Sequence, residues 1–557
     1  MLKAMKHNPI RHFIMTVIGT ACVLTSAAQT DTVAMRAMRD ELRRNVEQLA
    51  IPGYPKPFFT SFMLLRGHSV NIDASLGAVV RAQSNAVSMP FVRQIVGDRR
   101  FSSEEAGIFR NTDAGNFPLE SDYDLIRRWF WSASDGAYRY AISNYARRVN
   151  RVHQQNLNPD MMPDDMAPAE VTQTYIPYPY KSTEFDMARC RDYVARAAAR
   201  IDSHPELTRS SVNMYGIQSE VMFLSSEGAE VVVPYNFIQL SIRASAENSD
   251  NVSFSDMLTI NVPTVDDLPA EKALYERIDA FADALAELTR LPATDDDYFG
   301  PVLLEGDAVA SFVDMFMTLQ LINNKAPLGQ SMRTADQKLG KRVASPVVNI
   351  TGTPRVAEYG GTRLWGSFDV DIDGVRPADT LVLVRDGMLC ALMANRVATR
   401  KVPATNGYAH FVFTQQGFGQ MPAPGVLDID VSQSYAQADA YAELIRQARN
   451  EGLEYAYIIR SFVSAGNNGK LKIPELYRIR VADGAVERCA PATLEVDNNV
   501  ARRIVAASAT KAAHNRTNNG VLCSYICPES MIVSEAEILP FDSPRSQPFA
   551  VPEPPRK

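Results

Sequence analysis

Three aspartates at alternate positions, followed by a glycine, are the first residues in this sequence that suggest chemistry. In the stretch WGSFDVDIDGV they are Asp369, Asp371 and Asp373. Alternating carboxylates also open an EF-hand calcium loop, but that loop needs an acidic twelfth residue and flanking helices. Here the twelfth position is Thr380, the ninth is Pro377, and strand-like sequence flanks the segment. The pattern therefore predicts a turn between strands, in which Gly374 supplies an unusual backbone angle.

Histidine and cysteine, the common ligands of zinc, are sparse and scattered. Beyond the N-terminal segment the histidines are His68, His153, His204, His410 and His514. No two of them have the spacing of a local zinc motif. Cys523 and Cys527 are separated by three residues, without the second pair that a closed zinc site requires. The two cysteines could form a disulfide or stay free thiols, and they could lie away from any cleft; the sequence leaves these alternatives open. No nucleophile elbow, phosphate-binding loop or dinucleotide motif is present, so the residues alone define no reaction.

The first residues have the pattern of a secretory signal peptide. Three basic residues precede the apolar run FIMTVIGTACVLT, and the small residues Ser26 to Ala28 follow it. This order predicts export to the periplasm or out of the cell, and the run is too short for a comfortable membrane span. A lipoprotein anchored at Cys22 is the alternative, which Gly19 disfavours because a lipobox takes a branched apolar residue there. No later run is long and apolar enough to cross a bilayer.

The mature chain is acidic and large. Removing residues 1–28 takes away three basic and no acidic residues, which leaves 54 Lys and Arg against 64 Asp and Glu, a net charge of −10. Nucleic acid is excluded as a partner, because phosphate binding needs clustered basic residues. With 557 residues, 46% of them hydrophobic, the chain can bury more than one core.

Helical and strand-like segments predict an α+β fold in two domains. Long amphipathic segments, one beginning at Ser121 or Asp122, alternate with antiparallel strands in the first half, and hairpins dominate the second. Glu227-Gly228, Asp386-Gly387 and Asp483-Gly484 lie at the predicted hairpin turns, and the Asp-Gly pairs predict positive φ at both central residues. The predicted organisation is a signal peptide at 1–28, an N-terminal α/β domain at 29–290 with a proline-rich surface excursion at 155–182, a β-rich C-terminal domain at 291–540, and a disordered proline-rich tail at 541–557.

The segment around the aspartates resembles the C-terminal core of the TldD/PmbA family. That family has a DDPT…G…DDEG segment, a Val-Pro-Ala-like step and a hairpin of the LVxDGxL kind. The matching pieces are Gly352-Thr353-Pro354, Gly360-Gly361, Asp371-Ile372-Asp373-Gly374, Arg376-Pro377-Ala378 and Asp386-Gly387. GPVLLEGDAVASF, from Gly300, is similar to the family strand that leads into the active-site helix. The resemblance covers most of the mature chain and implies the family fold.

Catalytic members of that family are zinc peptidases, and this chain departs from them at the metal site. Their HExxxH motif supplies two histidine ligands and a glutamate base, and a cysteine near the C-terminus completes the shell. Here Val313 or Asp314 replaces the first histidine, and Asp314 or Met315 the glutamate. The second histidine falls within 317–319, and no histidine occurs between His204 and His410. We therefore predict no catalytic residue and no metal ligand, with Cys523 as a vestige of the cysteine position.

The resemblance implies a role without catalysis. PmbA-type members, also called TldE, lack the zinc motif and pair with a zinc-bearing TldD-type subunit, and the two chains enclose unfolded peptides. We expect such a heterodimer, or alternatively a stand-alone peptide-binding or structural homodimer, and least of all a peptidase with a rearranged site. No cofactor is expected in this chain; zinc is expected in the partner. The candidate cleft residues are Asp314, Gly360, Gly361, Trp365, Gly366, Asp371, Asp373 and Gly374.

Overall fold

The computed structural model describes residues 32–104, 122–173, 184–291, 297–414, 417–464, 470–497, 499–518 and 520–541. The predicted signal peptide and, apart from Phe541, the predicted tail lie outside these residues. The fold is α+β, as predicted: an antiparallel sheet with long helices forms the N-terminal part, and the C-terminal part is rich in strands. Among the described helices, none combines the length and apolar character needed to cross a membrane.

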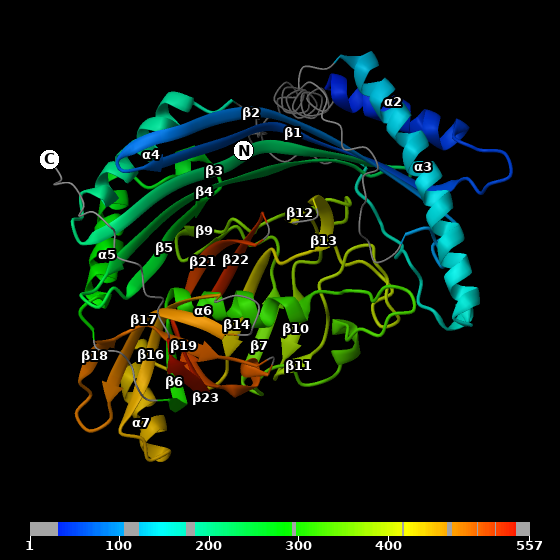
Figure 1. The fold of residues 1–557 in the computed structure, drawn as a ribbon. Helices are drawn as coiled ribbons and strands as arrows, with labels where there is room; N and C mark the ends of the chain where they lie inside the picture. Colours follow the sequence, from blue (N-terminus) through cyan, green and yellow to red (C-terminus); the bar gives the residue numbers. More distant parts are fainter. Residues whose placement is uncertain are drawn as a thin grey trace, which may run out of the picture.

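One five-stranded antiparallel sheet forms an arch over the rest of the chain (Figure 1). Its strands lie in the order β2-β1-β3-β4-β5. They are β1 (Pro57–Ser75), β2 (Ala78–Val96), β3 (Leu207–Ser225), β4 (Glu230–Glu247) and β5 (Ser253–Val262). Along most of these strands the register pairs even-numbered residues with even-numbered ones. Because side chains alternate between faces, even-numbered residues point to one face of the sheet and odd-numbered residues to the other.

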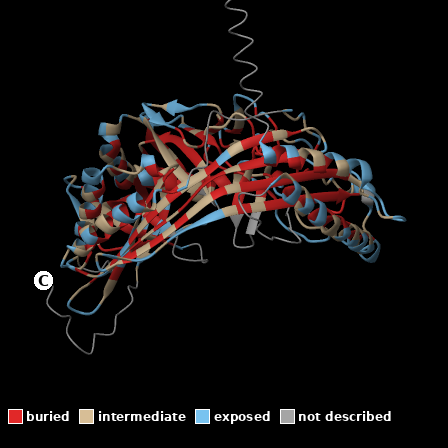
Figure 2. Cartoon of the chain, turned by 90° about the horizontal axis from the view of Figure 1, so that it is seen from above, coloured by how far each residue is buried: buried red, intermediate tan, exposed pale blue. Residues whose placement is uncertain are grey.

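Helices cover the outer, even-numbered face of the sheet at both ends of the arch (Figure 2). The helices are α2 (Val33–Gln48), α3 (Tyr123–Gln154), α4 (Met187–Asp202) and α5 (Glu271–Leu288). Phe62 and Leu64 pack under α2 and α3, whereas Val70 and Ile72 pack under α4 and α5. The side chain of Asp122 caps α3, as the sequence predicted, by accepting a hydrogen bond from the backbone of Leu125. The main hydrophobic core of the N-terminal part therefore lies between these helices and the outer face of the sheet.

Two further sheets make up most of the C-terminal part. The six-stranded sheet has the order β11-β10-β7-β14-β22-β21. Its strands are β7 (Val348–Gly352), β10 (Leu381–Arg385), β11 (Met388–Leu389), β14 (Val426–Val431), β21 (Lys511–Asn518) and β22 (Val521–Pro528). Two hairpins stand beside it: β8 (Glu358–Tyr359) with β9 (Thr362–Arg363), and β12 (Ala409–Thr414) with β13 (Gly417–Pro422). The strand β21 is the end of the six-stranded sheet in the described part of the chain.

The other C-terminal sheet has eight strands, five of which close on themselves. Its members are β6 (Tyr298–Glu305), β15 (Ser434–Tyr435), β16 (Tyr455–Ser464), β17 (Lys470–Arg480), β18 (Val486–Cys489), β19 (Ala492–Glu495), β20 (Ile504–Ser508) and β23 (Ser530–Pro540). Because β6 pairs with both β16 and β23, the strands β23-β19-β17-β16-β6 form a ring. Helix α7 (Ala440–Asn450) packs against it.

The predicted turns are present, with one difference. Gly228 has a φ of 96° between β3 and β4, and Asp386 and Gly387 have φ values of 49° and 72° between β10 and β11. At the second Asp-Gly pair only Gly484 is left-handed, with a φ of 75°. Arg480 and Ala485 close a longer loop there, so the two-residue turn predicted at this pair was wrong.

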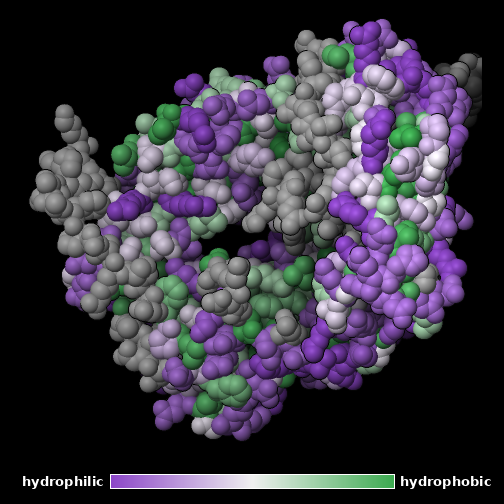
Figure 3. Space-filling view, turned by 45° about the vertical axis from the view of Figure 1, so that its right-hand side comes forward, coloured by the Kyte–Doolittle hydropathy of each residue, from purple (hydrophilic) through white to green (hydrophobic). Residues whose placement is uncertain are grey.

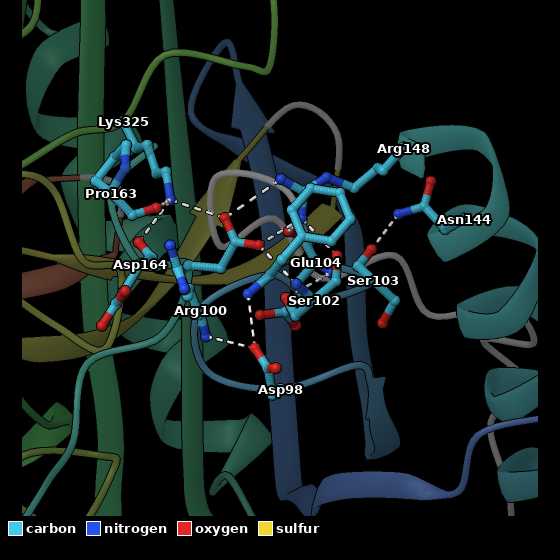
Figure 4. A network of polar contacts seen from close by, with 12 residues as sticks. Asp98, Arg100, Ser102, Ser103, Glu104, Asn144, Arg148, Pro163, Asp164 and Lys325 are labelled. Carbon is cyan, nitrogen blue, oxygen red and sulfur yellow. Dashed lines mark hydrogen bonds and ion pairs between the residues drawn. The ribbon is translucent and has the colours of Figure 1, made fainter. Parts of the chain in front are cut away.

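The proline-rich segment was predicted to be a surface excursion, and most of its described part is exposed or half-buried while it contacts both halves of the molecule. We call residues 158–173 the strap. Met166 forms a bridge with Val397, and Thr172 donates a backbone hydrogen bond to Gly374 at 2.7 Å. Figure 4 shows that the side chains of Arg148 from α3 and Lys325 from the C-terminal part both point toward the strap. Both ion-pair with the buried carboxylate of Asp165, at 2.7 and 2.8 Å.

Candidate functional site

The helix that resembles the family's active-site helix contains a π turn. It begins after Gly306 as α6 (Asp307–Phe312), continues as the π turn η3 (Val313–Met317), and ends as the short helix η4 (Thr318–Leu321). A π turn bonds residues five positions apart, and so brings them near the same side of the helix. Thr318 donates to the carbonyl of Val313 from its backbone and, at 3.2 Å, from its hydroxyl. This is the spacing of the two histidines in HExxxH.

A polar cluster fills the place where a metal site would lie. The Tyr525 hydroxyl donates a hydrogen bond to Asp314 Oδ1 at 2.5 Å. The Cys523 thiol lies 3.7 Å from the same hydroxyl, and Thr318 Oγ1 lies 3.5 Å from it. Cys523, Tyr525 and Thr318 are fully buried, and Asp314 is half-buried. The structure therefore brings the two sequence candidates, Asp314 and Cys523, together through a tyrosine.

Strand alternation explains how β22 presents these side chains. Cys523, Tyr525 and Cys527 are two residues apart and face the same core. Sequence reasoning missed Tyr525, although its place two residues after Cys523, within the domain predicted to be rich in strands, was a usable signal. Cys523 and Cys527 are both free thiols. Four residues of strand separate their Cα atoms by about 13 Å, and a disulfide needs less than about 7 Å, so they do not pair with each other.

Two groups of the cluster, the Cys523 thiol and the Tyr525 hydroxyl, have raised pKa values. Burial, and then the charge of Asp314, raise the pKa of the Cys523 thiol to about 12. Burial also raises the pKa of Tyr525 well above its ordinary value, with Cys523 and Asp314 adding to the shift. Near neutral pH both groups are therefore neutral hydrogen-bond donors. This protonation leaves Cys523 neither nucleophilic nor a metal ligand, because both roles require the thiolate.

The donor set at this position does not fit zinc. Val313 and Met317 belong to the apolar core, and Leu319 is 70% exposed. The carboxylate of Asp314 accepts a hydrogen bond from the Tyr525 hydroxyl, and the thiol of Cys523 beside it is protonated. Elsewhere in the described residues, no three His, Cys, Asp or Glu side chains gather as a metal-binding group. The absence of a metal in this chain stays a prediction from the sequence.

Ion pairs fix the end strand β21 to the start of the helix. Arg516 pairs with Asp307 at 2.6 Å and donates to Ser311 Oγ at 2.8 Å. His514 Nδ1 lies 3.8 Å from the carboxylate of Asp307. These contacts hold the edge of the six-stranded sheet next to the polar cluster. An extended chain that paired with β21 would thus run past the cluster of Asp314, Tyr525 and Cys523.

The aspartates that opened the sequence analysis stabilise a turn and do not line a cleft surface. Asp371 accepts hydrogen bonds from the backbone N–H groups of Asp373, Val375 and Ala409, at 2.8 to 2.9 Å. Asp371 and Asp373 are each 2% exposed. Burial, with the charge of Asp373, raises the pKa of Asp371. Gly374 has the predicted left-handed backbone, with a φ of 82°. The flanking residues are irregular, however, so the predicted turn between strands is a turn within a long loop.

The remaining cleft candidates lie on one short stretch of chain but differ in their surroundings. Gly360 and Gly361 form the tip of the β8–β9 hairpin. Trp365 is half-buried and packs against the core beneath α4 and α5. Gly366 lies so close to Gly425 that a Cβ atom would stand 2.2 Å from the Gly425 carbonyl oxygen. A role for these residues in peptide binding stays a prediction.

The molecule is hollowed between its two halves. Figure 3 shows an opening between the arch of the N-terminal sheet and the C-terminal part below it. The strands β21 and β22 lie beneath the arch in Figure 1. The end strand of the sheet, the polar cluster and the opening therefore belong to one region of the molecule.

Comparison with known proteins finds a family domain in the C-terminal part of the chain. Residues 297–488 match the family model described as PmbA/TldA metallopeptidase C-terminal domain. This match includes the strand β6, the helix with the π turn and the aspartate turn. The C-terminal part of the chain is therefore similar to the TldD/PmbA family over residues 297–488. No curated protein matches it in sequence.

Solved structures share the fold over nearly the whole chain. TldE from Thermococcus kodakarensis aligns with a TM-score of 0.56 and 11% identity, over 90% of this chain and 100% of its own. A candidate modulator of a DNA gyrase from Thermotoga maritima aligns with a TM-score of 0.53 and 14% identity, over 86% and 96%. One from Bacteroides thetaiotaomicron gives 0.56 and 10%, over 91% and 98%. At these identities the likeness concerns the fold alone.

Proposed function

We propose that this chain is the non-catalytic subunit of an exported peptidase complex, in which a TldD-like partner carries the zinc. The polar cluster is the observation that carries this proposal. Asp314, Tyr525 and Cys523 form a hydrogen-bonded group in place of a metal shell, and burial keeps the thiol protonated. A chain with this cluster contributes enclosure and binding, while a relative with the HExxxH motif performs hydrolysis.

The role in enclosure follows from the edge strand and the opening. Strand β21 pairs with β22 on one side and ends its sheet in the described chain. An extended peptide adds to such an edge through main-chain hydrogen bonds, which require little side-chain selectivity. The arch above β21 would restrict access to chains that are already unfolded, because a folded domain is wider than a single strand.

Purification from the native cell envelope tests this proposal. The tagged chain should recover a relative that contains HExxxH, and mixing the two purified proteins should give zinc-dependent cleavage of an unfolded peptide such as reduced, carboxymethylated lactalbumin. The mixture should lose activity on chelation, and the present chain alone should have none. Recovery of a homodimer without such a relative would favour the stand-alone binding protein. Chelator-sensitive cleavage by this chain alone would contradict the proposal.

A further inference from the structure

The inner face of the arch carries a row of four amide side chains and one tyrosine at the end away from the strap. The register places one residue of this row on each of the five strands. In spatial order they are Gln83, Asn71, Tyr215, Gln239 and Asn261. All five are odd-numbered, so they point away from the helices and toward the opening. We call these five residues the amide row.

The amide row is accessible, whereas the residues beside it on the same strands are not. Ile72, Ile238 and Leu240 point to the outer face and are fully buried under the helices. Gln83 is exposed, and the other four members of the row are partly exposed. This half of the sheet thus has one face in the core and one that remains open to a ligand.

Cross-strand hydrogen bonds order the side chains but use only part of their capacity. Gln239 donates to Asn261 Oδ1 at 3.2 Å, and Asn71 Oδ1 accepts from Asn213 in the next row at 2.9 Å. A primary amide offers two donors and an oxygen with two lone pairs, so each amide retains groups for a ligand. The oriented amides form a surface that can both donate hydrogen bonds to a ligand and accept them from it.

The amide row and the row next to it carry no net charge. In the next row, Arg81 and Asp73 pair with each other at 2.6 Å, followed by Asn213, Ser241 and Thr259. The amide row itself contains no charged residue. A ligand matched to this face therefore gains from many hydroxyl or amide contacts and little from charge.

Aromatic rings lie within the same face. The ring centroids of Tyr215 and Phe237 are 5.7 Å apart, and both side chains are partly exposed. Such rings offer an apolar surface to C–H groups and keep a polar edge on tyrosine. Alternating apolar and hydroxyl-rich surfaces are the defining property of pyranose sugars.

From this arrangement we infer that the amide row binds a neutral, linear glycan. Neighbouring strands are about 4.8 Å apart, so the row presents one side chain about every 4.8 Å over roughly 19 Å. That interval is close to the length of one pyranose unit in an extended β-1,4-linked chain. An extended peptide repeats side chains on one face only about every 6.6 Å, so it would fall out of step with the row. Glycan binding here is independent of the peptidase role proposed above.

Calorimetric titration of the full mature chain with cellohexaose and chitohexaose, two uncharged β-1,4-linked hexasaccharides, tests this inference. The wild-type chain should bind at least one of them. The Gln239→Ala/Asn261→Ala double variant should bind about tenfold more weakly, since it loses two neutral hydrogen-bonding groups. Asn450→Ala, an exposed amide at the end of α7, is the matched control and should leave binding unchanged. Tyr215→Phe should retain more binding than Tyr215→Ala, because it keeps the ring.

Thermal unfolding of each variant separates lost contacts from lost structure, and the open position of these side chains predicts unchanged midpoints. The inference is overturned if neither hexasaccharide binds the wild-type chain, or if the double variant and Asn450→Ala bind equally well. It is also overturned if the uncharged hexapeptide Gly-Ser-Ala-Gly-Ser-Ala binds and the double variant abolishes that binding, which would assign the row to peptides.

Discussion

The inner face of the arch has two halves that differ in the side chains that strand alternation places there. Near the strap, odd-numbered residues are apolar, and they pack on the C-terminal part through Phe411, whose ring lies 5.0 Å from Tyr235 and 6.2 Å from Phe91. Toward the other end the odd-numbered residues become the amide row and remain accessible. One sheet therefore joins the two parts of the molecule at one end and leaves a binding surface at the other.

The joined half is reinforced by buried charge, whereas the open half is not. Side chains of Asp165, Arg148 and Lys325 are only 7%, 4% and 14% exposed. Burial lowers the pKa of Lys325, and the charge of Asp165 opposes that effect. A buried ion network tolerates no missing partner, so rigidity should be concentrated at the strap.

The largest effect is expected from removing the central ring of the apolar joint. Phe411→Ala should lower the free energy of unfolding by about 3–5 kcal/mol, because it removes a buried aromatic side chain and leaves a cavity. Phe299→Ala, which truncates a ring that is 61% exposed, is the control and should change stability by less than about 1 kcal/mol. Denaturant unfolding followed by circular dichroism measures both. Equal effects of the two substitutions would contradict the distinction between joint and surface.

Neutralising the strap carboxylate should be nearly as damaging. Asp165→Asn leaves Arg148 and Lys325 buried without their shared anion, which should cost about 3 kcal/mol of unfolding free energy. Hydrogen exchange of residues 158–173 should rise at the same time. Asp160→Asn is the control. It breaks the ion pair between Asp160 and Arg100, whose side chains are 80% and 57% exposed, respectively, and should lower the free energy of unfolding by less than about 1 kcal/mol. If Asp165→Asn were as mild as its control, the strap would not be a joint.

A smaller, pH-dependent effect is expected from His410, which is next to Phe411 on β12 and faces the C-terminal core. Its ring packs on Phe368 at 4.7 Å, and burial lowers its pKa from 6.5 to about 4. The folded protein therefore holds this histidine neutral while the unfolded chain protonates it below pH 6.5. The stability it contributes is present above pH 6.5 and is lost as the pH falls, by about 2 kcal/mol between pH 6.5 and 5.

His410→Phe should flatten that part of the stability profile, measured as unfolding midpoints across the pH range. His153→Gln, at an exposed position near the end of α3, should leave the profile unchanged. An unaltered slope in His410→Phe would mean that another group causes the loss of stability in acid.

The smallest effect should come from the open half. Gln239→Ala removes a partly exposed side chain and one cross-strand hydrogen bond, and should change the free energy of unfolding by at most about 0.5–1 kcal/mol. Thermal unfolding checks this. A loss comparable to that of Phe411→Ala would show that the amide row is structural, and would remove the contrast between the two halves.

Local features of this fold were predictable from the sequence. The Asp386-Gly387 turn, the cap at Asp122 and the left-handed Gly374 each depend on a few neighbouring residues, and the structure confirms them. The loss of the zinc motif was also readable, because no shift of alignment supplies a histidine to 313–319. Where local chemistry decides the conformation, the sequence is sufficient.

Features that depend on strand register or distant contacts were not predictable. Tyr525 meets Asp314 across 211 residues, and the amide row exists only because five strands align in one register. The strap looked like a polar, proline-rich surface loop, since nothing nearby shows that Asp165 has two buried cationic partners. In each case the partner that gives the residue its role lies far away in the chain.

Zinc stoichiometry of the purified, isolated chain, determined by elemental mass spectrometry after incubation with excess Zn²⁺ and removal of free metal, tests the central claim most directly. The hydrogen-bonded cluster of Asp314, Tyr525 and Cys523, with its protonated thiol and hydroxyl, predicts far less than one tightly bound zinc per chain and no peptide cleavage. One zinc per chain, lost together with hydrolysis when Cys523 is replaced by Ser, would contradict it.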